Sequence, residues 1–447
     1  MSALVERARR LLSSRRSIVV IVAAAAALIV VAFFIQGYAL STLTVDRGAV
    51  RSWLGGDGLY SYRDPHSLLG TALPPPAAHA LAPIALLPAA LAGWLLALAG
   101  LAALTLSMVA LAAPVARRYG RSITPVVTIA TLLALALEPV RATIGLGDRD
   151  LIVFGLVVAD IVALRRSAWA RSRAAWWPGG ANPRGLWATG GWAGVGIGIA
   201  TALSVGPALF IAYLAVTRQW RAALTALGTA FTLAAGALLT APRETAAWFD
   251  EVLWRLDRTG GIDQTGNQSL AGVLARLYDS ATTPILLWLS FAMLLLAVGF
   301  IRARSAHQDG DEIAAFTLIG LTGAIIGPIT GTHELIWVAP AVLILLDAAN
   351  RCRLTERRPL PGQGRRFPGL GLAAAALATY LLFLVAPVWI FDDAVLRNAY
   401  ALGLILLVNT LPWRAGVAPA FPINRWLGRR RPVAARVIPP ARRPMGS

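Results

Sequence analysis

Carboxylates close to the edge of a membrane are the first candidates for chemistry in this sequence. Asp46 follows a long apolar run at 17–40 by a few residues. An ionisable side chain at that depth is costly unless it faces protein or water, so Asp46 is a candidate functional residue. The alternative is that Asp46 caps a following helix, because Asp is a favoured N-cap residue and Arg47 and Arg51 could pair with it. The residues alone leave both interpretations open.

His333 and Asp57 are the other candidates. His333 is one of four histidines, and beside carboxylates it could hold a phosphate or a sugar hydroxyl. The alternative is that it only packs against Trp337, one helical turn on. Asp57 lies in Gly55-Gly56-Asp57-Gly58, a composition typical of a tight turn. No histidine pair has helical spacing with a third ligand nearby, so no metal site is expected.

The composition shows what kind of structure must position these residues. The chain has 447 residues, 57% of them apolar and 14% charged, with a mean hydropathy of +0.65. The apolar share is higher, and the charged share lower, than in typical soluble domains, which indicates a membrane protein. The single cysteine, Cys352, excludes a disulfide framework and a cysteine metal cluster. The net charge of +19 is spread between apolar runs and forms no single stripe, so we expect no nucleic-acid partner.

Apolar runs long enough to cross a bilayer recur along the chain, and a bilayer core of about 30 Å needs about 20 apolar helical residues. We therefore expect an all-α, polytopic membrane protein with about twelve transmembrane helices. The pair around Gly194, Gly198 and Gly206 is the least regular, because glycines and Pro207 interrupt it. The predicted spans are 17–40, 91–116, 122–138, 150–165, 187–202, 206–218, 221–241, 284–301, 312–328, 335–350, 367–388 and 394–412.

The distribution of arginines along the chain predicts its orientation in the membrane. With the N-terminus in the cytoplasm, 31 of the 41 arginines fall inside and the other 10 outside, as the positive-inside rule requires. Carboxylates divide the other way, with 15 of 22 on or near the outer side. This predicts a cell-membrane protein with both termini cytoplasmic and an active site on the periplasmic or extracellular face. The expected parts are a cytoplasmic N-terminus (1–16), a transmembrane catalytic domain (17–412) with outer loops at 41–90 and 242–283, and a basic, disordered cytoplasmic tail (413–447).

Several segments together resemble one family of membrane enzymes. Asp46, then Gly58-Leu59-Tyr60, then the proline run at 74–76 before an apolar helix resemble the opening of glycosyltransferase family 87, of the GT-C superfamily. Later segments follow in the family's order over roughly residues 45–350: Glu138-Pro139-Val140-Arg141, Trp220-Arg221-Ala222-Ala223-Leu224, Gly266-Asn267-Gln268-Ser269-Leu270, Gly272-Val273-Leu274-Ala275-Arg276 and Gly327-Pro328-Ile329-Thr330-Gly331-Thr332-His333.

Four segments depart from the family pattern, among them the Ser204 region, which replaces a Lys before the proline of the glycine-rich pair. Leu73-Pro74-Pro75-Pro76 replaces a Tyr-Pro-Pro-Phe-like sequence, and His333-Glu334 replaces a pair of histidines. Gly145-Leu146-Gly147-Asp148-Arg149-Asp150 stands in the Gly-Gln-Val-Asn region. These departures concern the donor and the acceptor, and they leave the expected GT-C fold unchanged.

The resemblance implies an integral-membrane, inverting glycosyltransferase of the phosphatidylinositol mannoside or lipomannan type. Its donor would be polyprenyl-phosphate-mannose and its acceptor a glycolipid or glycan on the outer face. By position, Asp46 would be the general base, ahead of Asp57, and His333 would orient the acceptor or the donor phosphate. Arg141, Arg258 and Arg276 would meet the leaving phosphate, unless they only anchor to lipid headgroups. The residues carried over as donor-binding candidates are Arg141, Arg258, Arg276, Asn267 and Gln268.

Two alternatives remain. The same fold could use polyprenyl-phosphate-arabinofuranose, or the chain could be a lipid or solute transporter, because spans broken by glycine and proline also mark transport sites. Against a transporter, the sequence has no internal repeat halves, and its charged residues collect at the outer rim. No cofactor is expected besides the lipid-linked donor, and the need for a divalent ion stays open.

Overall fold

The computed structural model describes residues 15–176, 185–255, 260–279, 283–356 and 368–414. Over these ranges the chain is helical and has no extended sheet, as the apolar runs predict. Arg258, the first fourteen residues and almost all of the predicted tail lie outside the described residues. The predicted division into domains therefore stays a prediction.

The helices follow the apolar runs closely where those runs are uninterrupted. The predicted span 91–116 is part of α5, and 221–241 coincides with α12. The helix bounds in the first half of the chain are α2 (Arg15–Tyr38), α3 (Ser41–Leu54), α4 (Pro75–Ala85), α5 (Ala89–Arg118), α6 (Ile123–Ala136), α7 (Glu138–Leu146), α8 (Asp150–Trp176), α9 (Leu186–Thr189), α10 (Val195–Leu203), α11 (Ala208–Val216) and α12 (Trp220–Thr240).

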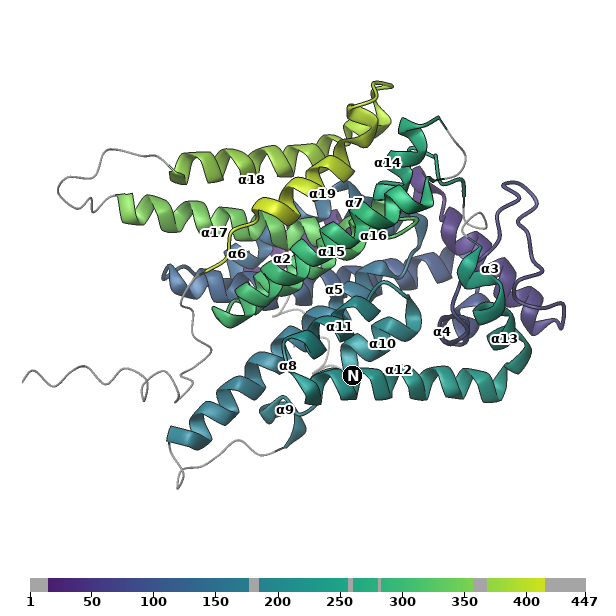
Figure 1. The fold of residues 1–447 in the computed structure, drawn as a ribbon, viewed down its shortest axis with the longest axis horizontal. Coiled ribbons are helices and arrows are strands. Elements are labelled where there is room, and N and C mark those ends of the chain that lie inside the picture. The colour runs from purple at the N-terminus through teal and green to yellow at the C-terminus, as the bar shows by residue number, and fades with distance from the viewer. Residues whose placement is uncertain (1–14, 177–184, 256–259, 280–282, 357–367, 415–447) are drawn as a thin grey trace, which may run out of the picture.

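The second half alternates long helices with short ones. Its elements are α13 (Pro242–Asp250), η1 (Val252–Trp254), α14 (Leu270–Leu277), α15 (Ile285–Gln308), α16 (Glu312–Ile326), η3 (Thr332–Trp337), α17 (Val338–Glu356), α18 (Pro368–Val385), η4 (Pro387–Trp389), η5 (Leu396–Asn398) and α19 (Ala399–Thr410). The long helices run mostly lengthwise through the molecule, and α3, α4 and α13 lie together at one end, on the right of Figure 1.

The structure describes a multi-pass membrane protein with fewer long spans than predicted. Among the described residues, five helices are long and apolar enough to cross a membrane, or up to seven if two bent pairs each count as one span. The predicted number of twelve is therefore not reproduced. The glycine-rich pair 187–202 and 206–218 gives one reason: it forms α10 and α11, each nine residues long, separated by a break at Gly206-Pro207.

The bend between α2 and α3 brings Asp46 to its place. The two helices meet at 72°, and Ala39 and Leu40 between them have positive φ angles. The Leu40 backbone N–H donates to the Gly145 carbonyl oxygen at 3.0 Å, so α7 fixes the turn. Since α3 carries three charged residues in fourteen, we place it outside the membrane-spanning part of α2.

Candidate active site

Asp46 lies in the middle of α3 with both carboxylate oxygens engaged. Oδ1 accepts a hydrogen bond from Thr71 Oγ1 at 2.7 Å, and Oδ2 lies 3.4 Å from Arg149 Nη1. Burial raises the pKa of Asp46 to about 6, while Arg149 and Thr71 oppose this rise. Such a carboxylate is largely ionised at neutral pH and more basic than an exposed aspartate.

The capping alternative for Asp46 is wrong. The residue is the sixth of α3, so it cannot be the N-cap. Arg47 and Arg51 donate instead to carbonyl oxygens at the end of α4, including that of Ala85, at 3.1 and 2.7 Å. Carbonyls at a helix C-terminus lack intrahelical partners, which explains why arginines bind there. Asp46 is therefore free of both arginines and pairs with Arg149.

A short turn between α7 and α8 supplies the other charged groups. Gly147 ends α7 with φ near +72°, a conformation that favours glycine. Arg149 then reaches Asp46 and also donates through Nε to the Leu203 carbonyl at 3.1 Å. Although burial disfavours the charged guanidinium, the surrounding carboxylates, Asp148 first, raise the pKa of Arg149. Arg149 is therefore held as a cation beside the candidate base.

His333 faces this turn from η3. Its Nε2 atom lies 3.8 Å from Asp148 Oδ2 and 3.8 Å from Asp150 Oδ2. The ring stands against the backbone of Gly331, where a Cβ atom would clash with it. The His333 carbonyl accepts from Thr143 Oγ1 at 3.1 Å, which ties η3 to α7. The sequence thus brings a histidine together with two carboxylates more than 180 positions earlier.

The structure gives little support to the alternative that His333 only packs against Trp337. Trp337 makes its ring contacts elsewhere, with Phe154 at 4.9 Å and Phe210 at 5.2 Å between centroids. The His333 side chain keeps 22% of its surface exposed, and its nearest charged partners are carboxylates. We therefore place His333 in the site. Its part in the reaction stays a prediction.

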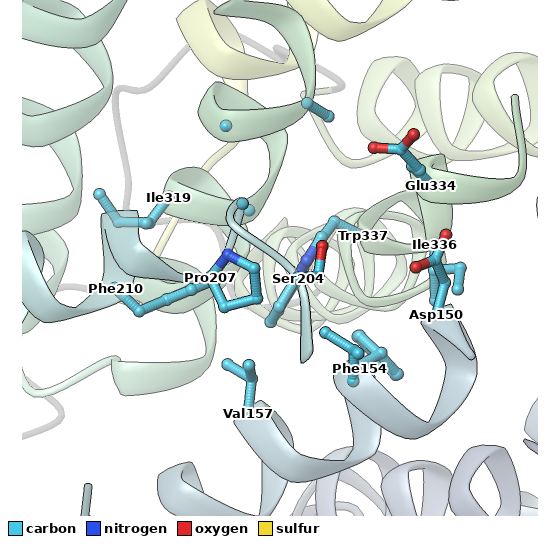
Figure 2. A pocket seen from close by; sticks show the side chains of 15 residues that line it. Asp150, Phe154, Val157, Ser204, Pro207, Phe210, Ile319, Glu334, Ile336 and Trp337 are labelled. Atoms are coloured by element: carbon cyan, nitrogen blue, oxygen red, sulfur yellow. The ribbon is translucent and has the colours of Figure 1, made fainter. Parts of the chain in front are cut away.

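An amphipathic cavity of about 100 Å³ adjoins this cluster. Figure 2 shows Asp150 and Glu334 on one side of it and Pro207, Phe210 and Ile319 on the other. Asp150 belongs both to this cavity and to the group that faces His333. A small charged region thus continues into an apolar pocket between α8, α11 and α16, as a ligand with a polar head and an apolar body would require.

Asp57 does not join the cluster. It is exposed in the turn that follows α3, where its N–H donates to the Ser52 carbonyl and Gly56 and Gly58 have positive φ angles. These glycines and the exposed aspartate form the turn that their composition predicts. Of the two early carboxylates, the structure assembles only Asp46 into a site.

Asn267 and Gln268 bind the backbone. Asn267 Nδ2 donates to the carbonyls of Ile262 and Pro328, and Oδ1 accepts from the backbone N–H of Thr330 at 3.0 Å. Gln268 is fully buried, and its amide group bonds backbone atoms of three other residues: Thr265, Arg397 and Ala401. Asn267 thus holds the segment 260–279 against the loop that precedes His333, and Gln268 holds it against η5 and α19. Donor binding by either residue stays a prediction that no contact here supports.

Of the predicted phosphate-binding arginines, Arg276 is bound to protein groups through several N–H groups, and Arg141 through one, while the buried Nε of Arg141 has no hydrogen-bond partner among the described residues. Arg276 donates twice to Asn398 Oδ1, at 2.9 and 2.6 Å, and to two backbone carbonyls; burial, then Arg397, lowers its pKa to about 10. Arg141 donates to the Leu384 carbonyl in α18. Arg258 lies outside the described residues. The cation beside Asp46 is Arg149, which is absent from the predicted site.

Three comparisons with known proteins bear on this arrangement. The sequence profile of glycosyltransferase family 87 matches residues 73–328. A polyprenol-phosphate-mannose-dependent alpha-(1-2)-phosphatidylinositol mannoside mannosyltransferase of Mycobacterium tuberculosis is 28% identical over 209 residues, 47% of this chain and 44% of that protein. A related phosphatidylinositol pentamannoside mannosyltransferase of the same species is 25% identical over 225 residues, 50% of this chain and 46% of the relative.

The solved structure of ArnT from Cupriavidus metallidurans covers 89% of this chain and 76% of its own, with a TM-score of 0.40 and 16% identity. The chain spans about half the length of the curated relatives it matches. The profile, by contrast, covers more than half of the chain and includes the turn at 148–150 and the loop 260–279. The resemblance noted in the sequence is confirmed: the chain belongs to glycosyltransferase family 87.

Proposed function

We propose that this protein is an inverting mannosyltransferase that takes mannose from polyprenyl-phosphate-mannose and attaches it to a glycolipid or glycan acceptor. The observation that carries the proposal is the largely buried carboxylate of Asp46, oriented by Thr71 and by Arg149. Arg149 is followed in the chain by Asp150, which lines the amphipathic cavity. The mannose donor is inferred from the names of the relatives that match half of the chain.

The residues suggest the following reaction. Asp46 accepts the proton of the acceptor hydroxyl as that oxygen attacks C1 of the sugar. The bond from C1 to the phosphate oxygen breaks on the opposite face, its electron pair goes to the phosphate, and the anomeric centre inverts. Arg149 lies 3.4 Å from Asp46, so one cation can orient the base and also stabilise the departing phosphate. The apolar cavity would receive a ligand's hydrocarbon part.

The outer face of the cell membrane is the proposed location of the site. The support is the arginine distribution over the twelve spans predicted from the sequence, which favours cytoplasmic termini by the positive-inside rule. The test uses cysteines introduced at positions 260 and 360 after Cys352 is replaced. In intact cells an impermeant thiol reagent should label position 260 and spare position 360, whereas the reverse pattern would refute this topology.

A transfer assay tests the proposed donor and acceptor together. Purified protein in nanodiscs would be incubated with labelled polyprenyl-phosphate-mannose and a panel of phosphatidylinositol mannosides, with polyprenyl-phosphate-arabinofuranose as a parallel donor. We expect labelled product from the mannose donor in the wild type, and about 10² to 10⁴ times less from Asp46→Asn. Product only from the arabinofuranose donor would replace the proposed sugar, and no product from either would refute the proposal.

A further inference from the structure

The charge balance of the site does not suit an anionic donor. Four carboxylates lie within electrostatic reach of Arg149: those of Asp46, Asp148, Asp150 and Glu334. When all four are ionised, their negative charge exceeds the positive charge that Arg149 and a protonated His333 could supply together. A donor whose leaving group is a phosphate would bring further negative charge into this largely buried region. Either protons or a bound cation must offset that charge.

The atoms nearest His333 have the separations of ligands around one metal ion. His333 Nε2, one Asp148 oxygen and one Asp150 oxygen all lie within 4.8 Å of one another. Donor atoms about 2.0–2.3 Å from a shared ion lie roughly 3 to 4.5 Å apart. The two His333 distances, 3.8 Å each, fall inside that range. Asp148 lies in the turn after α7, Asp150 begins α8 and His333 lies in η3, and η3 packs against both α7 and α8.

A second observation comes from Asp150 itself. Its Oδ2 atom, the one that faces His333, is buried and has no hydrogen-bond partner in the part of the chain that the structure describes. A buried carboxylate oxygen without a donor is costly, and such oxygens are normally satisfied by a proton, a water or an ion. The neighbouring carboxylate of Glu334 does have a hydrogen-bond partner, because its Oε1 accepts from the Gly331 N–H at 3.1 Å.

We infer that Asp148, Asp150 and His333 bind one divalent cation of the Mn²⁺ or Mg²⁺ class. Two carboxylate oxygens favour these hard ions, and the His333 imidazole would add a third, nitrogen ligand. Three protein ligands leave coordination positions open for an oxygen of the donor phosphate. This last step rests on the proposed function; binding of the ion by the three side chains does not.

The ion would complete the reaction proposed above. When the C1–O bond breaks, the electron pair moves onto the phosphate, and the ion and Arg149 together would stabilise that charge. No redox change is involved, and the acceptor proton still goes to Asp46. The rival explanation is that His333 is protonated and forms ion pairs with both carboxylates, in which case no metal is needed.

Metal binding is tested without any donor. The full chain, purified in nanodiscs and stripped with EDTA, is titrated with MnCl₂, and free Mn²⁺ is followed by its EPR signal. We expect one Mn²⁺ bound per chain in the wild type. Asp150→Asn and His333→Gln should weaken binding at least tenfold, since even outer-shell changes typically cost 10–100-fold. Asp250→Asn, an exposed carboxylate of α13, is the matched control and should bind like the wild type.

The outcomes separate the two proposals. No stoichiometric Mn²⁺ in the wild type, or equal binding in Asp150→Asn and the wild type, overturns the metal site and favours the imidazolium ion pairs. Thermal stability of each stripped variant, compared with the stripped wild type, shows whether it is folded. Mannosyl transfer that persists in EDTA would refute the metal's role while the proposed function stands. Mn²⁺ binding without transfer from any donor would refute the function and leave the metal site intact.

Discussion

Two polar regions of this molecule look alike in sequence and differ in structure. The loop 260–279 carries Asn267 and Gln268, whose amide groups are occupied by backbone atoms of neighbouring segments. The turn 148–150 faces His333 with carboxylate oxygens, one of which has no hydrogen-bond partner among the described residues. The first region holds the protein together, and the second retains binding capacity for something else.

The difference teaches how to tell a positioning residue from a ligand-binding one. A buried polar side chain whose donors and acceptors all bond to backbone stabilises a loop, and its loss leaves several backbone groups unsatisfied. A buried polar side chain that points at like-charged or unpaired neighbours is costly to the fold and is retained where chemistry needs it. Mutations in the two regions should therefore separate activity from stability.

The largest effect is expected at Asp46. Asp46→Asn keeps the size of the side chain and a hydrogen bond with Thr71 but cannot accept a proton. We expect transfer to fall by about 10² to 10⁴ while the thermal unfolding temperature stays close to that of the wild type. Asp57→Asn, in the exposed turn, is the control and should retain near-full activity. If Asp57→Asn lost activity and Asp46→Asn did not, the base would be Asp57.

The next effect is expected at Arg149. Arg149→Ala removes the guanidinium that lies beside four carboxylates, so transfer should fall by roughly 10². Because Arg149 lowers the pKa of Asp46, its removal should also move the acid limb of the pH–rate profile to higher pH. Arg149→Lys keeps the charge and should restore part of the activity. A variant with unchanged rate and unchanged pH profile would remove Arg149 from the site.

Much of the fold was predictable from the sequence alone. Of the residues in the candidate site, Asp46 and His333 were predictable as well. Apolar runs predicted α5 and α12 almost to their ends, because a helix in lipid needs little beyond length and apolarity. The 72° bend after α2 carried no such signal: Leu40 adopts a positive φ because its N–H binds Gly145, a contact between distant segments.

The turn 148–150 shows why the rest of the site was missed. Asp148-Arg149-Asp150 stands in the family's Gly-Gln-Val-Asn region and was therefore read only as a departure from the pattern. Two aspartates flanking an arginine just before an apolar span were a usable signal, since charges at a span's edge are costly. That they face His333 could not be predicted from the sequence, because 182 residues separate Asp150 from His333.

A third, smaller effect tests the other half of the comparison. Asn267→Ala leaves the buried backbone N–H of Thr330 and the Ile262 carbonyl without this partner, whereas the Pro328 carbonyl still accepts from Ser269 Oγ. We expect the unfolding free energy to fall by about 2–4 kcal/mol. Protein that is still folded should keep the donor KM of the wild type, because the amide touches only protein. A raised donor KM in a variant of normal stability would return Asn267 to the donor site.

The smallest effect is the pH dependence of the wild type. With a pKa of about 6, Asp46 is half protonated near pH 6, so kcat/KM should fall about twofold there and tenfold per pH unit below. Unfolding would not explain the loss. The folded-state pKa lies above the ordinary value of 3.8, so the folded chain binds this proton more tightly than the unfolded chain. Acidification between pH 6 and 4 therefore stabilises the fold as far as this group is concerned.

The check is to measure kcat/KM and the unfolding temperature on the same samples between pH 5 and 8. Activity that stays flat down to pH 5 would mean that the base has an ordinary carboxylate pKa and is not the buried Asp46.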